Sequence, residues 1–94
     1  MGTQSWWADH EQITQEAAER VLAVLGDPYP KPGGFFTALI NVMFQADPDN
    51  LRKLSLAFPA EANAVWCWQN HHDGPALLRR KARMLPPMSS ELIA

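Results

Sequence analysis

The sequence predicts an all-α fold, a compact bundle of four to five short helices. Three observations lead to this prediction. Apolar residues recur at helical rather than alternating spacing, Pro, Gly and Asp separate the apolar runs, and 94 residues is the length of one domain. With 47% hydrophobic and 19% charged residues, the chain is too apolar to remain disordered. We therefore expect residues 1–94 to form a single helical domain.

The first helix is expected to begin near Asp9, where a following Gln12 resembles a capping box, or a turn earlier at Ser5. Gly26 is a typical C-terminal stop. Between them lies an amphipathic stripe, with apolar residues three or four positions apart. The stripe consists of Ile13, Ala17, Val21 and Leu25.

Residues 27–34 are rich in proline, with Pro28, Pro30 and Pro32 alternating with other residues. Each proline fixes its own φ and disfavours a helix at the residue before it, so this segment is expected to be an extended connector. The alternative is a short polyproline ligand for an aromatic groove. Residues 35–46 then follow as a helix that is apolar around most of its circumference, and we expect it to be the central and most buried one.

Three further helices are expected. Asp47 can cap a helix that begins at Pro48, and a second restart is predicted at Pro59. The last helix should run from Ala76 to about Leu85. Residues 65–69 could also be written as a strand, but no partner strand is evident, so helix is favoured. Residues 1–8 and 86–94 are expected to fray.

Composition excludes several classes of protein. Cys67 is the only cysteine, so no internal disulfide can form, and no run of 18 apolar residues exists to span a membrane. The first residues lack the basic and apolar regions of a secretory signal, which predicts a cytoplasmic protein. Charge is uneven, at −4 over residues 1–30 and +3 over residues 79–94. This polarity could attract a partner or draw the first and last helices together.

Four short motifs follow one another in the middle of the chain: GGFFTALI at 33–40, AD at 46–47, NLRKL at 50–54 and AFP at 57–59. The segment that contains them covers about a third of the sequence and resembles a segment of small uncharacterised accessory proteins of actinobacterial tailed phages and prophages. The resemblance implies a phage or prophage origin, an accessory role and a location in the cytoplasm of the infected bacterial host. It implies no catalytic activity.

Tryptophan is unusually frequent, with four in 94 residues. Residues two positions apart on a helix point about 200° apart, so Trp66 and Trp68 cannot both face one core. Trp6 and Trp7 diverge by about 100°. At least one ring should therefore be exposed unless a second chain or another element covers it. Tryptophan is enriched in binding hot spots, which makes these four residues the candidate protein-binding surface.

The sequence supports a metal site or a catalytic site less than it supports a protein-binding surface. His71, His72 and Asp73 are adjacent, but no CxxC or HxxxH spacing accompanies them, so we expect a solvated helix end and no metal. Cys67 lies one helical turn before His71, the spacing that a thiolate and its base require. No third orienting group or oxyanion site is recognisable. We expect a small buried thiol, no enzyme activity and no cofactor.

The last helix carries the strongest signal for nucleic acid, because four cations fall within five residues and could neutralise phosphates. They are Arg79, Arg80, Lys81 and Arg83. Against this interpretation, the chain is acidic overall, with a pI of about 5.8. The same cations would also complement the dipole of their own helix and pair with the acidic first helix.

These observations predict a small non-enzymatic interaction module that binds a host or phage protein through an aromatic surface around Trp66 and Trp68, with Trp6 and Trp7 as contributors. Nucleic-acid binding by the basic helix is the alternative. A homodimer is left open, because a chain of 94 residues can complete its core across a two-fold axis.

Overall fold

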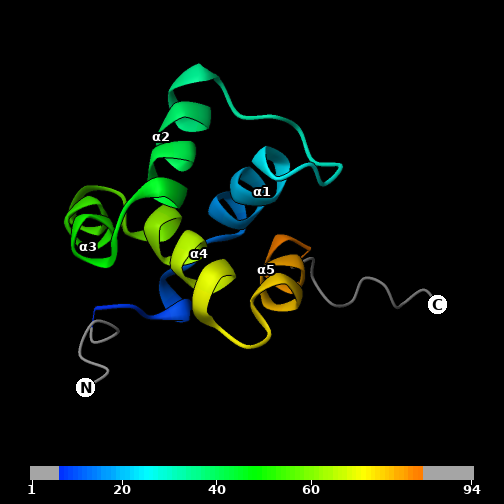
Figure 1. Ribbon diagram of the computed structural model, residues 1–94. Coiled ribbons are helices and arrows are strands. Elements are labelled where there is room, and N and C mark those ends of the chain that lie inside the picture. Colours follow the sequence, from blue (N-terminus) through cyan, green and yellow to red (C-terminus); the bar gives the residue numbers. More distant parts are fainter. Residues whose placement is uncertain (1–6, 84–94) are drawn as a thin grey trace.

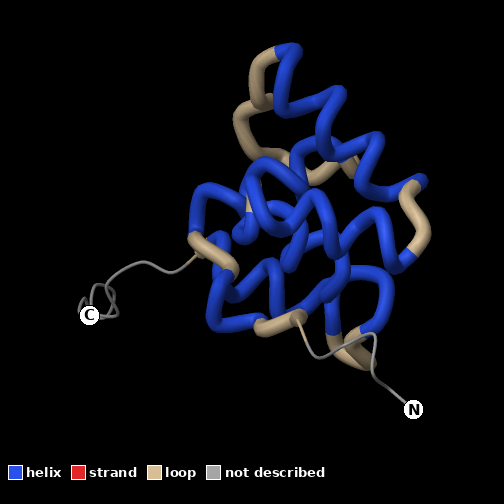
Figure 2. Tube along the Cα trace, turned by 90° about the vertical axis from the view of Figure 1, so that its left-hand side faces the viewer, coloured by secondary structure: helices blue, strands red, loops and turns tan. Residues whose placement is uncertain are grey.

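A computed structural model describes residues 7–83, and this part of the chain contains five α-helices and no strand. Figures 1 and 2 show helices joined by loops, the longest of them between α1 and α2, which confirms the all-α prediction. The helices are α1 (Gln15–Val24), α2 (Gly34–Gln45), α3 (Pro48–Ala57), α4 (Pro59–Asn70) and α5 (Gly74–Ala82), preceded by the 3-10 turn η2 (His10–Gln12).

The centre of the bundle is α4, which runs through the middle of Figure 1. It packs against η2 and against each of the other four α-helices. Its buried positions include small residues, among them Ala62 and Ala64, which let neighbouring helices approach closely on several sides. The expectation that residues 35–46 form the most buried helix is therefore wrong. In α2 only Ile40 and Met43 are buried, because this helix packs mainly against α1 and α4.

The first helix was expected to begin near Asp9, but the short turn η2 occupies that position and α1 begins after it. Asp9 caps η2 by accepting a hydrogen bond from the Glu11 amide, and α1 begins only at Gln15. The cap of α1 is Thr14, whose hydroxyl accepts a hydrogen bond from the Ala17 amide at 3.0 Å. Asp9, the expected cap of the first helix, thus caps η2 instead, and Ser5, the alternative cap, lies outside the described residues.

The buried side chain of Asn63 connects η2 to α4 through hydrogen bonds. Its side-chain oxygen accepts a hydrogen bond from the Asp9 amide at 2.6 Å, and its side-chain nitrogen donates to the Pro59 carbonyl at 2.8 Å. Both polar ends of this buried amide are therefore satisfied, as a buried polar group requires.

The predicted stop of α1 is confirmed. Gly26 has a φ of +108°, a conformation that is easily adopted only by glycine, and the Asp27 amide returns to the Leu22 carbonyl at 2.9 Å. The proline-rich connector then leads to α2 without helical structure, as predicted, and α2 begins one residue early at Gly34.

Proline marks the start of both middle helices, as predicted. The Asp47 carboxylate caps α3 by accepting from the Asn50 amide at 2.8 Å, with Pro48 in the first turn. Phe58 ends α3 and directly precedes Pro59, the first residue of α4. One residue between two helices forces a sharp change of direction, and α3 packs back onto α4.

The turn between α4 and α5 depends on Gly74, which is buried. A Cβ atom at this position would collide with the Cys67 carbonyl oxygen in the last turns of α4. Only a residue without a side chain allows α5 to begin so close to α4. The helix starts here, two residues before Ala76, the position expected from the sequence.

A buried ion pair links α1 to α4. Glu61 is only 6% exposed, and its carboxylate lies 2.7 Å from the guanidinium of Arg20. The same guanidinium stacks over the Phe36 ring, with 4.0 Å between Cζ and the ring centroid. Arg20 thereby connects three helices of the bundle.

Residues 1–6 and 84–94 lie outside the described part of the chain, and most of the expectation of fraying falls on them. Trp7 and Ala8 are described, and both are half-buried.

Candidate protein-binding surface

An apolar stripe runs along the outer side of α2. Phe35, Ala38, Leu39 and Val42 recur at the spacing i, i+3, i+4, i+7, so their side chains share one face of the helix. We name these four residues the α2 stripe. Phe35 is 62% exposed and Val42 is 53% exposed, while Leu39 is half-buried. Figure 1 shows the first turns of α2 standing beyond the other helices.

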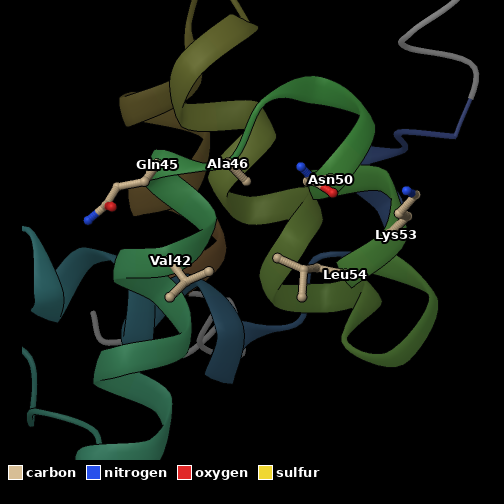
Figure 3. Close-up of a pocket in the computed structure, with 6 residues that line it drawn as sticks. All are labelled: Val42, Gln45, Ala46, Asn50, Lys53 and Leu54. Carbon is tan, nitrogen blue, oxygen red and sulfur yellow. The ribbon is translucent and has the colours of Figure 1, made fainter.

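A groove lies beside the carboxyl-terminal half of the stripe, between α2 and α3 (Figure 3). The two helices are consecutive but are not among the closely packed pairs of the bundle, which leaves about 400 Å³ of open space between them. Val42 and Leu54 face one another across this space in Figure 3. The groove is lined by Val42, Gln45, Ala46, Asn50, Lys53 and Leu54.

Aromatic packing holds the amino-terminal end of the stripe in place. The Phe35 ring lies 5.2 Å from that of Phe36 and 5.7 Å from that of Phe58, measured between centroids. Phe36 is in turn held beneath the Arg20 guanidinium. Phe35 is thus an exposed ring on a fixed support, and little conformational freedom remains for it to lose on binding.

The stripe lies in an electrically neutral region, because α2 contains no charged residue from Gly34 to Gln45. At the groove, Lys53 is paired with Asp49 at 3.5 Å, and Arg52 pairs with the same carboxylate at 3.3 Å. Hydrogen bonding from these two cations holds the pKa of Asp49 below its usual range. These three charges sum to +1, and the N-cap residue Asp47 brings the net charge at this end of α3 to zero.

The described tryptophans are half-buried and pack against the core. The Trp7 ring meets Trp66 edge-on, 6.3 Å between centroids, and the Arg79 guanidinium lies 5.9 Å from the centroid of Trp68. Segments outside α4 thus cover both sides of that helix, which is how the bundle accommodates two rings that point apart. Trp66 and Trp68, around which an exposed aromatic surface was expected, are both half-buried, and protein binding through them stays a prediction. Trp6 lies outside the described residues.

Two of the four cations in the basic cluster already face acidic groups. Arg79 forms two hydrogen bonds with the Asp27 carboxylate, at 2.9 and 3.2 Å, and an Arg80 nitrogen lies 3.9 Å from the Asp73 carboxylate. Lys81 is half-buried, and Arg83 is exposed. The sequence offered pairing with the acidic first helix as one explanation of the cluster, but the partner of Arg79 is Asp27, in the loop that follows α1. This pairing lowers the positive field available to a phosphate backbone, and nucleic-acid binding stays a prediction.

The ion pair between Arg79 and Asp27 should make the stability of the fold depend on pH. Hydrogen bonding from Arg79 holds the pKa of Asp27 below its usual value, which is near 3.9 in an unfolded chain. The pair therefore stabilises the fold at neutral pH, and this contribution disappears as the pH falls through the lowered pKa. We expect Asp27→Asn to lower the urea midpoint at pH 7 and to lower it much less near pH 2. Arg79→Gln should show the same pattern. An equal loss at both pH values would contradict the assignment.

The candidate nucleophile Cys67 is buried, and desolvation raises the pKa of its thiol. This favours the protonated form, which is the weaker nucleophile. The fold also brings His10 to His71, 6.2 Å between ring centroids, and His72 stacks on His71 at 4.7 Å. Across residues 7–83, no group of three or more potential ligand side chains is arranged to hold a metal ion.

The sequence interpretation missed the α2 stripe as a surface. It assigned these residues to the core because α2 is apolar on nearly all sides. A usable signal was present, since a 94-residue chain has few elements with which to cover a helix on every face.

Comparison with known proteins identifies no relative: no family model, no curated protein and no solved structure matches the chain. The resemblance to phage accessory proteins therefore stays a prediction. None of the helices in the described part of the chain combines the length and the hydrophobicity that crossing a membrane requires.

Proposed function

We propose that this protein is a small interaction module that binds another protein chain through the α2 stripe and the adjoining groove, and that it catalyses no reaction itself. The observation that carries the proposal is the exposure of Phe35 and Val42 on an uncharged helix beside an open groove.

Large exposed apolar side chains that share one face indicate an interaction site, whereas single exposed apolar residues do not. The stripe combines exposed apolar residues with an adjacent groove between two helices, and such grooves commonly receive the apolar face of a partner helix. Phe35 is an aromatic side chain held by its neighbours, which is typical of an interface anchor. The proposal thus keeps the predicted protein-binding function and moves its surface from the tryptophans to α2.

Val42→Glu tests the proposal, because it places a charge at the edge of the groove without removing a core residue. The tagged protein and this variant are used as baits in a nuclease-treated lysate of the source cells. We expect at least about a tenfold loss of bound protein with the variant, since burying an unpaired charge in an interface is costly.

Leu56→Glu is the matched control. Leu56 is 78% exposed, more than Val42, but it does not line the groove. This control should retain binding. Equal capture by the wild type and both variants would contradict the proposed surface. Loss of all bound material on nuclease treatment of the wild-type sample would instead favour the basic cluster.

A further inference from the structure

We propose that the partner of the α2 stripe is a second copy of this chain, paired through two antiparallel α2 helices related by a two-fold axis. This inference rests on the proposed function, because it identifies the occupant of the same surface. Each copy would place its Phe35 ring against the groove of the other beside Val42.

The first argument is the position of ring and groove on one helix. Phe35 and Val42 are seven residues apart, which is about two turns, and they lie on the same side of α2. When two such helices run antiparallel, the ring of each meets the groove end of the other. The groove has about 400 Å³ of space, enough for a phenylalanine ring. Each copy then contacts the other in the same way, and two copies complete the assembly, as a two-fold interface requires.

The second argument is electrostatic. Because α2 carries no charged residue, two copies of it meet without like-charge repulsion, and a highly charged partner would gain nothing from this face. The amino end of α2 also lacks a side-chain cap, since its N-cap is Gly33. In the antiparallel arrangement Asp47 of the second copy lies about one helical turn beyond that end. A carboxylate there complements the positive end of the helix dipole.

The third argument concerns area. A stable dimer buries about 800 Å² on each partner. The proposed contact consists of one exposed face of a helix about 18 Å long and an adjoining groove, which is small for such an interface. We therefore expect an exchanging dimer with a dissociation constant on the order of 10 µM.

Ala38 provides the most specific test, because it is exposed and lies between Phe35 and Val42, close to the proposed axis. Substitution of an exposed alanine by a longer helix-forming residue removes no packing. Across the axis, however, Ala38→Glu brings two carboxylates together, and Ala38→Lys brings two ammonium groups together. Each variant alone should dimerise at least about tenfold more weakly than the wild type.

The experiment is sedimentation equilibrium of the full chain and its variants, from about 1 µM to about 500 µM, a range that brackets the expected affinity. The wild-type mass should rise from 10.5 kDa toward twice that value. An equimolar mixture of Ala38→Glu and Ala38→Lys should recover dimerisation, since opposite charges then face one another. Leu56→Glu is the control and should behave as the wild type.

An introduced cysteine checks the register. Ala38→Cys should give a disulfide-linked dimer on mild oxidation, whereas Leu56→Cys should not. The native Cys67 is buried and does not compete. Circular dichroism melts of all variants verify that each one is folded.

Three results would overturn the inference: a wild-type chain that stays monomeric at the highest concentration, dimerisation of Ala38→Glu with unchanged affinity, or a mixture of charge variants that does not recover. A monomeric wild type whose capture of a different protein is lost on Val42→Glu would remove the inference and leave the proposed function standing. If Val42→Glu affects neither dimerisation nor the capture of any other protein, both the dimer inference and the proposed function fail.

Discussion

Gly74→Ala is expected to cost about 3 kcal/mol or more of folding free energy, the largest effect of any single methyl group that we foresee in this protein. The added Cβ would collide with the backbone carbonyl of Cys67 and come within 3.0 Å of the Trp68 Cα. Backbone atoms inside α4 cannot move aside as a flexible side chain could. The α4–α5 angle would have to open, and Leu78, which is fully buried, would lose its packing.

Urea denaturation followed by circular dichroism measures this effect, and Gly34→Ala is its control. Gly34 is the first residue of α2, and a Cβ placed there meets nothing within 4 Å. Alanine also favours a helix more than glycine does, so this variant should match or exceed the wild type by about 0.5 kcal/mol. Similar losses in the two variants would mean that the close approach of α5 to α4 is not what requires glycine.

Arg20→Ala is expected to destabilise the protein by about 3 kcal/mol at pH 7, which is much of the stability of a domain this small. The substitution leaves the Glu61 carboxylate in the core without its cation. It also removes the guanidinium that covers the Phe36 ring. We place the loss at the lower end of the range for buried pairs because the Arg20 side chain is 30% exposed.

A double variant separates the charge from the packing. Arg20→Met with Glu61→Leu removes both members of the pair and keeps apolar volume at each position. Its stability should be close to that of the wild type, because an apolar pair of similar size can replace a buried ion pair. Chemical denaturation of Arg20→Met, Glu61→Leu and the double variant completes the double-mutant cycle. A double variant as unstable as Arg20→Ala would show that the unpaired Glu61 carboxylate is not the main cause of the loss.

The sequence predicted the elements of this fold wherever one residue type has a strong local effect. Pro48 and Pro59 begin helices because proline has no N–H to leave unbonded there, and Gly26 ends α1 because the chain must adopt a positive φ. The start of α1 was predicted too early, near Asp9 or Ser5, because Asp9 is a good cap. Asp9 caps η2 instead, and its amide bonds to Asn63, a residue 54 positions away that no local pattern links to it, while Thr14 caps α1.

The arrangement of the helices was less accessible to prediction. Hydrophobicity indicates which residues prefer burial, but the depth of burial depends on how many neighbours each helix has. α2 is the more hydrophobic helix and lies at the edge, whereas α4 lies at the centre because small residues let the others approach it. The exposure of the tryptophans depends on neighbouring elements in the same way. At least one ring was expected to be exposed, and Trp7, from a segment expected to fray, packs edge-on against Trp66.

The contact between the first and last helices sets when this protein can fold during its synthesis. The Gln15 side chain donates to the Ala82 carbonyl, 67 positions later, and α1 packs against α5 as well as α4. At about 5 to 20 residues per second, roughly 3 to 13 seconds separate the translation of these two ends. During that interval the apolar side of α1 has no completed core to enter. The bundle can therefore be completed only after α5 has been translated and has left the ribosome.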